Sequence, residues 1–226
     1  MSFYLSMIIK AQEKLNNISI SGGIGLSNKS YYDIIIPHLI KSKNGLSSLF
    51  KIEYGREIKQ LEISLSISHN KYSDIFKIET DSFFIGDTTL FVGLKEKATT
   101  SLLYFQLAPE LKCNFIINDR ISCYTGFSFG INHIYREKYH VISDFRAIFN
   151  NIDTTYINPN LSHFNKIVMS GKLFFGLSYK LSDNFSVCTD INYESFFGKI
   201  IKPELPPAFL VRLYNYGLNA GVKYHF

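Results

Sequence analysis

The chain has 226 residues, 46% of them apolar and 19% charged, and this length suits one domain better than two separate cores. Its longest apolar runs, at 3–9 and 33–40, reach about half of the roughly 20 residues that a membrane-spanning helix needs, which excludes a helical membrane bundle. The net charge of +5 is spread along the chain without a Lys/Arg run, so we expect no nucleic-acid partner.

The first segment, residues 1–12, reads MSFYLSMIIKAQ and resembles the end of a signal peptide, although it lacks a basic n-region and a full h-region. We expect a truncated signal peptide or a disordered leader here. From residue 13 onwards the sequence predicts a single all-β domain, because Phe and Tyr are abundant and no stretch shows a helical stripe.

Stretch after stretch then alternates apolar and polar residues with period two, which is typical of strands with two different faces. Ile18, Ile20 and Ile24 fall on one face of the first stretch, opposite serines and glycines. The predicted strands are 18–26, 49–58, 60–72, 102–115, 121–135, 166–181, 185–197 and 209–226. Pro109 lies inside one of them and cannot donate a ladder hydrogen bond, so we expect a bulge or a local irregularity there.

The connections alternate strictly between short turns and long loops. Three hairpins close in a few residues, whereas the other connections span roughly 29–46, 73–101, 136–165 and 198–208. This layout predicts a closed antiparallel up-and-down β-barrel of eight strands, since closure removes unpaired strand edges. Residues 88–95 (TTLFVGLK) form either an extra strand, which would favour ten strands, or an extension of a neighbouring one.

Charged residues gather on one face of the predicted strands, and the other face is almost wholly Ile, Leu, Val, Phe and Tyr. Six acidic and five basic residues share the polar face: Lys51, Glu53, Glu57, Glu62, Glu110, Lys112, Lys172, Lys180, Asp190, Glu194 and Lys223. Charges so nearly balanced suit a narrow lumen in which they pair. The alternative is a soluble, lipocalin-like barrel with its apolar face inside, but an exposed apolar belt favours a transmembrane barrel.

The last predicted strand supports the membrane interpretation. Asn219, Gly221, Tyr224 and Phe226 have the spacing of a polar residue, a glycine and two aromatics on an alternating strand. This pattern resembles the assembly signal of outer-membrane barrels. The resemblance implies the barrel assembly machinery and periplasmic chaperones as partners.

Residues 16–226 resemble the outer-membrane β-barrel families that include PorT-like and OmpX/OmpA-like small barrels. Residues 102–115 (LLYFQLAPELKCNF), followed by 121–132, are similar to the strand-turn-strand centre of PorT-like proteins. The resemblance implies an outer-membrane β-barrel domain over residues 13–226 in a Gram-negative cell envelope. Outer-membrane lipid and lipopolysaccharide would surround it, and an envelope accessory role would be possible.

Catalytic and metal-binding patterns are weak. Cys113, Cys123 and Cys188 form no C-x-x-C pair and lack a His at ligand spacing, so we expect no metal and no cofactor. Cys113 and Cys123 either pair or serve as small apolar side chains. His69 and His133 lack a Ser two residues away on the same face, and we expect membrane-boundary positions for both and a lumen position for His225.

The loops are the remaining surface for function. Residues 31–37 (YYDIIIP) and 82–85 (SFFI) either bind an extracellular or envelope protein partner or pack the loops together. We expect a non-enzymatic barrel with a structural, surface-interaction or envelope-machine accessory role. The alternatives are a small-solute pore and a lipid A-modifying enzyme.

Overall fold

The computed structural model describes residues 16–32, 40–80, 83–85, 88–90, 93–147, 150–156, 165–197 and 210–226. Residues 1–12, for which the sequence predicts a signal peptide or leader, lie outside these ranges. All of the elements that it contains are β-strands, and the described residues include no helix long and apolar enough to cross a membrane.

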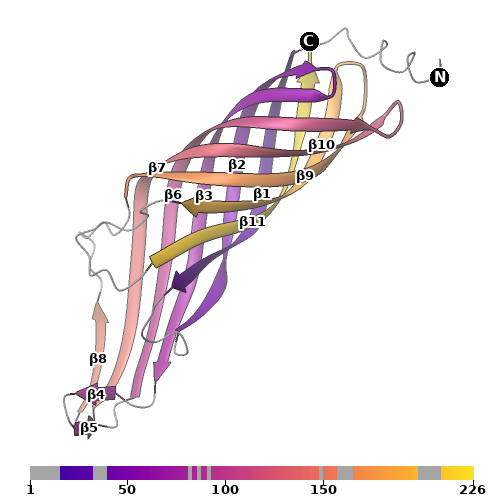
Figure 1. The fold of residues 1–226 in the computed structure, drawn as a ribbon. Coiled ribbons are helices and arrows are strands. Elements are labelled where there is room, and N and C mark those ends of the chain that lie inside the picture. The colour runs from indigo at the N-terminus through magenta and orange to yellow at the C-terminus, as the bar shows by residue number, and fades with distance from the viewer. Residues whose placement is uncertain are drawn as a thin grey trace.

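Eight strands form a closed antiparallel barrel, which confirms the predicted fold class (Figure 1). They are β1 (Asn16–Tyr32), β2 (Ile40–Ile58), β3 (Leu61–Thr80), β6 (Gly93–Ile116), β7 (Ile121–Ala147), β9 (Ile167–Lys180), β10 (Phe185–Phe197) and β11 (Leu210–His225). Each pairs with the next around the barrel, and β11 pairs with β1 from Asn17↔His225 to Tyr32↔Leu210, which closes it. The barrel therefore has no free edge along its closed part.

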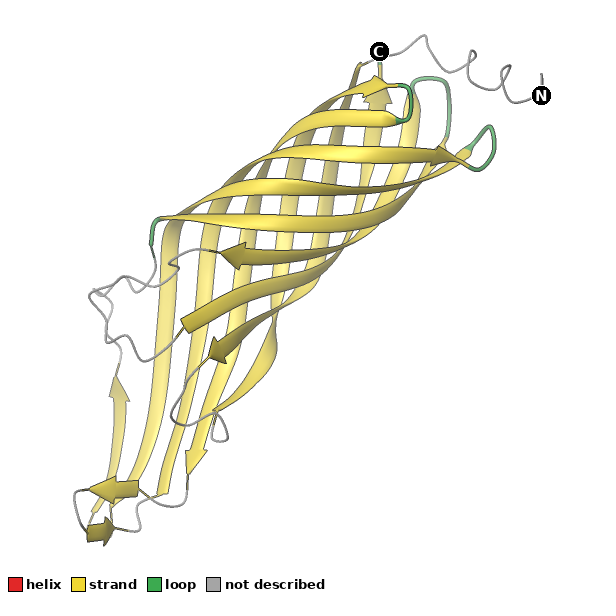
Figure 2. Ribbon diagram, viewed as in Figure 1, coloured by secondary structure: helices red, strands yellow, loops and turns green. Residues whose placement is uncertain are grey.

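Three tight turns lie at the end of the barrel that also holds the C-terminus (Figure 2). Lys59 adopts a φ of 58° in the turn between β2 and β3, the left-handed conformation that two-residue hairpin turns require. In the turn before β7, the Asn118 side chain accepts hydrogen bonds from the backbone N–H groups of Arg120 and Ile121 at 2.9 and 2.8 Å. Side-chain acceptors thus satisfy donors that the ladder cannot reach.

The strands on one side of the barrel continue far beyond it. β2, β3, β6 and β7 have 19, 20, 24 and 27 residues, against 14 in β9 and 13 in β10, whereas about 9–11 residues cross a membrane. β8 (Asn150–Tyr156) adds to β7, and β4 (Phe83–Ile85) pairs with β5 (Thr88–Leu90) at the far end of the molecule from the C-terminus (Figure 1).

The predicted loops 29–46, 73–101 and 136–165 were therefore too long. Antiparallel pairing continues through Thr80↔Leu94 and Gly93↔Arg146, although neighbouring apolar residues such as Ile75 and Phe76 interrupt the alternation there. Residues 88–95 do not add strands to the barrel, because Thr88–Leu90 pairs locally as β5 and Gly93 already begins β6. The count is eight, and the alternative of ten is wrong.

Pro109 interrupts pairing without creating a bulge. On the β7 side, register pairs stop at Leu107↔Ile131 and resume at Glu110↔Ser128 in the same register, while Pro109 still faces Leu65 of β3. The shift in register occurs higher up, between Leu103 and Tyr104. The predicted irregularity is thus a short gap in one ladder, as a residue without an N–H requires.

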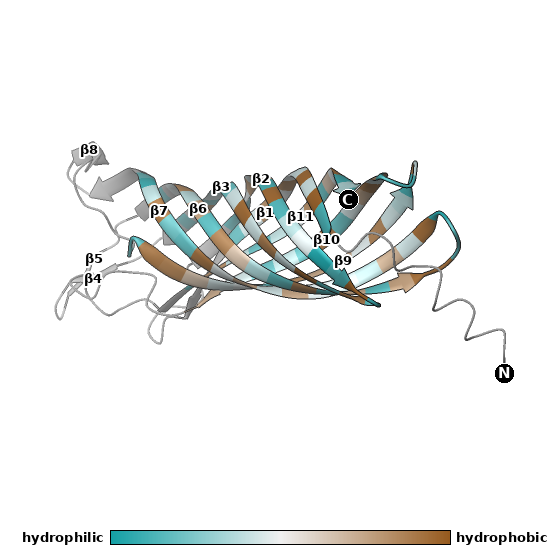
Figure 3. Ribbon diagram, turned by 90° about the horizontal axis from the view of Figure 1, so that it is seen from above, coloured by the Kyte–Doolittle hydropathy of each residue, from teal (hydrophilic) through white to brown (hydrophobic). Residues whose placement is uncertain are grey.

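Side chains alternate between an apolar outside and a mostly polar inside. Figure 3 shows hydrophobic and hydrophilic residues alternating along the strands. On β3, Ile63, Leu65 and Ile67 are 49–60% exposed, whereas Ser64, Ser66 and Ser68 between them are at most 5% exposed. The apolar face points outward, which is opposite to the arrangement of a soluble barrel.

Candidate functional site: the filled interior and the outer rim

A charge network fills the half of the interior nearest the tight turns. It consists of six buried side chains: Lys51, Glu53, Glu62, Glu110, Lys112 and Lys223. They come from β2, β3, β6 and β11, which meet there because inward positions of neighbouring strands share a register. Three lysines and three carboxylates balance, so the interior holds no net charge from this set.

Each lysine of the charge network contacts at least one carboxylate. Lys112 contacts Glu53 closely, and its Nζ lies 3.5 and 3.8 Å from carboxylate oxygens of Glu62 and Glu110. Lys51 Nζ lies 2.8 Å from Glu53 and 3.4 Å from Glu110. Buried charges are tolerable only when paired in this way, because desolvation of a lone charge costs several kcal/mol.

The network continues to the turn end of the barrel. Lys223 Nζ lies 2.8 Å from Glu62 and 3.7 Å from the half-buried Glu57. His225 Nδ1 lies 3.6 Å from the same Glu57 carboxylate. His225 therefore occupies the lumen position expected from its alternation.

A second hydrogen-bonded layer, which includes Glu194 and Lys172, lies above the charge network. Gln106 Nε2 donates to Glu194 at 2.5 Å and to Asn132 at 2.9 Å, and Ser170 Oγ donates to Glu194 at 2.8 Å. Lys172 is also buried and donates to Gln106 at 3.4 Å. A cavity of about 30 Å³ lies beside the charge network, lined in part by Lys51, Glu53, Lys112 and Lys223, and it has room for one or two water molecules.

Of two further predicted lumen charges, Asp190 lies in the lumen and Lys180 does not. Asp190 is half-buried and accepts hydrogen bonds from Asn219 at 2.8 Å and from Tyr124 at 3.4 Å. Lys180 lies outside the lumen: it is exposed at the end of β9, and its Nζ bridges Asp183 at 2.8 Å. The alternation places Lys180 on the inward side, but the lumen ends before it at the tight turn.

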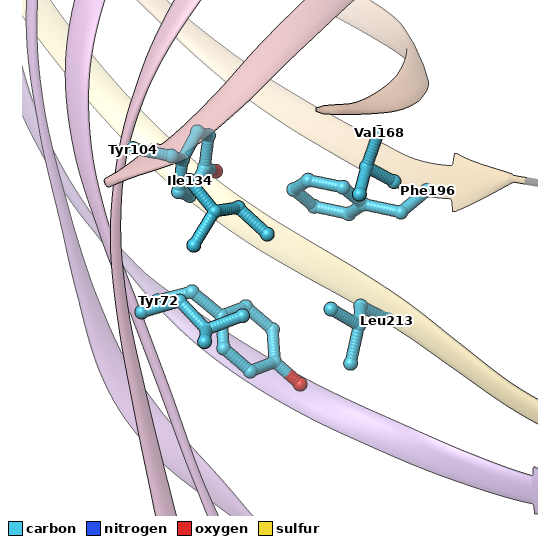
Figure 4. Packing of buried hydrophobic residues seen from close by; sticks show 7 residues of the cluster. Tyr72, Tyr104, Ile134, Val168, Phe196 and Leu213 are labelled. Carbon is cyan, nitrogen blue, oxygen red and sulfur yellow. The ribbon is translucent and has the colours of Figure 1, made fainter. Parts of the chain in front are cut away.

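An apolar plug closes the other half of the interior (Figure 4). Its members are all at most 7% exposed: Tyr72, Leu102, Tyr104, Ile134, Val168, Phe196 and Leu213. The Phe196 ring meets Tyr104 edge-on at 5.6 Å, and Tyr72 donates a 2.6 Å hydrogen bond to the Asn28 carbonyl. The sequence-based prediction of lumen residues considered only charged side chains and so missed the plug. Tyr72 and Tyr104 nevertheless fall on the same alternating, inward-facing positions as Asn70 and Gln106.

The residues of the predicted assembly signal divide between the two faces. Asn219 is buried, whereas Tyr224 and Phe226 are exposed on the outer face with ring centroids 6.0 Å apart. Gly221 lies against β1, where an added Cβ would meet the Ile20 carbonyl at 2.5 Å. Packing against β1 therefore requires a glycine at position 221, independently of any assembly factor that recognises the strand.

An aromatic group marks the boundary of the apolar belt on β3, β6 and β7. His69 Nε2 lies 2.7 Å from the Tyr135 hydroxyl, and the Phe105 ring packs between them at 5.2 and 5.1 Å. His133 is exposed and falls in register with Phe105. Aromatics of this kind form girdles at membrane interfaces.

A basic rim begins directly beyond this girdle. Its exposed cations are Lys43, Lys71, Lys77, Lys97, Arg136 and Lys138. Lys77 and Lys97 stand directly opposite each other in register. Lys71 and Arg136 flank Leu103 from its two neighbouring strands. Like charges that stand directly opposite each other are unfavourable unless anions neutralise them.

Other candidate residues remain separate. Cys113, Cys123 and Cys188 are free thiols, and no cluster of metal-binding side chains occurs among the described residues. Of the predicted loop segments, residues 33–37 and 82 lie outside the described residues, 31–32 end β1 and 83–85 form β4, and their binding role stays a prediction.

Comparison with known proteins finds similar folds but no similar sequences. No protein-family model and no curated protein matches the sequence. Neisserial surface protein A superposes with a TM-score of 0.48 at 13% identity, over 92% of this chain and 97% of that one. Ail, the attachment invasion locus protein of Yersinia pestis, gives 0.39 at 17% identity over 95% and 100%. The N-terminal barrel of Pseudomonas aeruginosa OprF gives 0.39 at 11% identity over 95% and 100%.

The strand pairing of this chain and the polarity of the inner and outer faces of its barrel identify the class of protein. A closed up-and-down barrel with short turns at one end, long hairpins at the other, a continuous apolar outer belt and an aromatic girdle is the architecture of outer-membrane barrels. The protein is an eight-stranded β-barrel of the bacterial outer membrane.

Proposed function

We propose that this protein is a non-enzymatic outer-membrane barrel with a structural or surface-interaction role, carried by its long hairpins. The observation that carries the proposal is the filled interior. A charge network, a hydrogen-bonded layer and an apolar plug occupy the lumen in succession, and an eight-stranded barrel is only wide enough for side chains to fill.

The extension of β2, β3, β6, β7 and β8 supplies the interaction surface. It projects beyond the closed barrel on one side only (Figure 1). Surface segments on a rigid scaffold commonly carry binding. An accessory role in an envelope machine, as the PorT-like resemblance implies, would use this extension, and insertion would use the barrel assembly machinery and periplasmic chaperones.

Planar-bilayer recording tests the proposal against the alternative of a small-solute pore. Purified, refolded protein should give no reproducible open channels, because each interior layer blocks the path of solvent. Heat-modifiable gel migration of the same preparation would show that the barrel is folded. Stable unitary currents from folded protein would contradict the closed interior.

Lipid A analysis tests the enzymatic alternative. The His69 imidazole contacts Tyr135 and Phe105, a girdle arrangement rather than a nucleophile-base pair. We expect the mass of lipid A to be unchanged when the gene is expressed. A mass change that disappears in His69→Ala or His133→Ala would overturn the non-enzymatic assignment.

A further inference from the structure

β1 and β2 separate before either strand ends. Their ladder stops at Ser27↔Gly45, and beyond it β1 pairs with β11 alone, as far as Tyr32↔Leu210. Residues 40–44 of β2 pair with β3 on one side. No strand among the described residues pairs with their other side. β2 therefore has an open edge along residues 40–44, which is about the usual length of a strand.

The separation is built into the fold at a bulge. The register between β2 and β3 shifts between Asn44 and Ser48, and bulges of this kind end pairing or redirect a strand. Ser27 lies at the point of separation, where its Oγ accepts a hydrogen bond from the Ser73 N–H at 3.1 Å and donates to the Ser73 carbonyl. The open edge of β2 therefore begins at a defined position.

Cations lie beside this edge. Lys41, Lys77 and Lys97, the lysine row, stand in register on β2, β3 and β6, and Lys43 lies two residues further along β2. Lys43, Lys77 and Lys97 are exposed, and none of them forms an ion pair with a described residue. The edge is thus positively charged.

A neighbouring row of the extension shows how charges in such a sheet can be matched. Glu79, Lys95 and Asp144 stand in register on β3, β6 and β7 and alternate in sign. Opposite charges directly across a sheet stabilise the pairing, whereas like charges destabilise it. The lysine row has no anion directly opposite its members, and the next position along the row is the open edge of β2.

The lysine row lies beyond the bilayer. Lys77 is eight residues further along β3 than His69 of the aromatic girdle, which corresponds to about 26 Å along the strand. Even for strands tilted by about 45°, this height exceeds the roughly 5–8 Å that the headgroups add to each side of the hydrocarbon core. A ligand of this row must therefore come from outside the bilayer.

We propose that an acidic, extended segment of a partner protein adds to β2 along residues 40–44 as a further strand of the extension. Residues 40–44 contain no proline, so each keeps its backbone N–H for a ladder. Carboxylates of the added strand meet the lysine row and Lys43. The same lysines disfavour pairing between two copies of this edge. The inference rests on the proposed surface-interaction role and deepens it by naming the chemistry of the partner.

Peptide binding to the full chain tests the site. The probe is a fluorescein-labelled heptapeptide of alternating glutamate and valine, and fluorescence anisotropy follows its binding to refolded protein in a zwitterionic detergent at low salt. The unmodified protein should bind it. Lys43→Gln combined with Lys77→Gln should weaken binding about fivefold, since two exposed ion pairs contribute on that scale. Lys138→Gln, which removes an exposed cation of β7 away from the edge, should bind like the unmodified protein.

A methylated peptide separates strand addition from attraction by charge alone. The same heptapeptide with an N-methyl group on every residue keeps its carboxylates but has no backbone donors. It should bind at least about tenfold more weakly, because the ladder hydrogen bonds are lost. Equal binding of the two peptides would overturn the inference, and so would unchanged binding by the double lysine variant. The peptide comparison uses the unmodified protein, so it decides the question even if that variant fails to fold.

Purified lipopolysaccharide is the competing anion. If it binds the folded barrel through Lys43 and Lys77 while the acidic peptide does not bind, the site belongs to saccharide phosphates and the inference is overturned. Heat-modifiable migration is measured on every preparation. A folded barrel that binds no acidic peptide would contradict only the strand addition, whereas open channels or an altered lipid A mass would contradict the proposed function.

Discussion

Glu62 is fully buried and holds two lysines of the charge network, Lys223 at 2.8 Å and Lys112 at 3.5 Å. Glu62→Ala should lower the free energy of unfolding by an amount near the lower end of about 3–5 kcal/mol. The loss falls at that end because Lys112 keeps Glu53 and Lys223 keeps Glu57. Urea unfolding in detergent, followed by gel mobility, measures the change.

Asp183→Ala provides the matched control. Asp183 also contacts a lysine at 2.8 Å, but its side chain is 87% exposed, so its removal should change the free energy of unfolding by only about 0–1 kcal/mol. Equal losses in the two variants would mean that the interior charges are hydrated, and the packed charge network would then be wrong.

Gly45 occupies the place where β2 changes register against β3. A Cβ there would meet the Ser73 carbonyl oxygen at 2.0 Å, whereas a Cβ at Gly22 would meet nothing closer than the Leu49 carbonyl at 3.8 Å. Gly45→Ala should therefore destabilise the barrel by about 1–3 kcal/mol through backbone displacement. The same unfolding measurement on Gly22→Ala should give a midpoint close to that of the unmodified chain, and a matching midpoint for Gly45→Ala would refute the close approach.

At the scale of a strand, depth in the membrane determines the effect of a charge. Leu65 and Leu61 both face outward on β3, but Leu65 lies halfway between the tight turn and the boundary at His69, whereas Leu61 adjoins the turn. Leu65→Arg should lower stability by about 2–4 kcal/mol and Leu61→Arg by about 0–1 kcal/mol. Folding yield into lipid vesicles would rank the two variants, and the reverse ranking would contradict the placement of β3.

Strands inside the barrel were predictable from the sequence because alternation is strongest where one face meets lipid and the other meets a packed lumen. Residues 185–197 were predicted as a strand, and β10 has those bounds. Outside the apolar belt that contrast fades, so the continuation of β3 to Thr80 and of β7 to Ala147 was missed. Pairing with an established neighbour, rather than periodicity, extends these strands.

The interior was predictable only in part, for a related reason. Parity identifies which residues point inward, and Glu53, Lys112 and Lys223 do. Parity does not tell where the lumen ends, so Lys180 was wrongly grouped with them. Nor did a search for charges reveal that Phe196, Tyr104 and Tyr72 form an apolar plug. The order of layers depends on the register between strands, which one sequence does not display.

At the scale of the whole molecule, the barrel has an inside and an outside that are reversed relative to a soluble protein. Polar and charged side chains are buried, and large apolar ones are exposed around the full circumference. Such a surface is stable only in contact with hydrocarbon, since exposed apolar patches of this extent drive aggregation in water. The closed interior and the projecting hairpins follow from the same eight-stranded frame, and the proposed surface-interaction role would use the rim and the extension.

Spin-label accessibility along β3 tests this arrangement most directly. In a background with the three cysteines replaced by serine, a nitroxide is placed at each position from 61 to 67 in turn and the protein is refolded into vesicles. Collision with dissolved oxygen, which concentrates in hydrocarbon, should peak at Leu61, Ile63, Leu65 and Ile67 and fall at the positions between them. If nitroxides at positions 61, 63, 65 and 67 instead collided with a water-soluble relaxation agent, that result would contradict the membrane barrel.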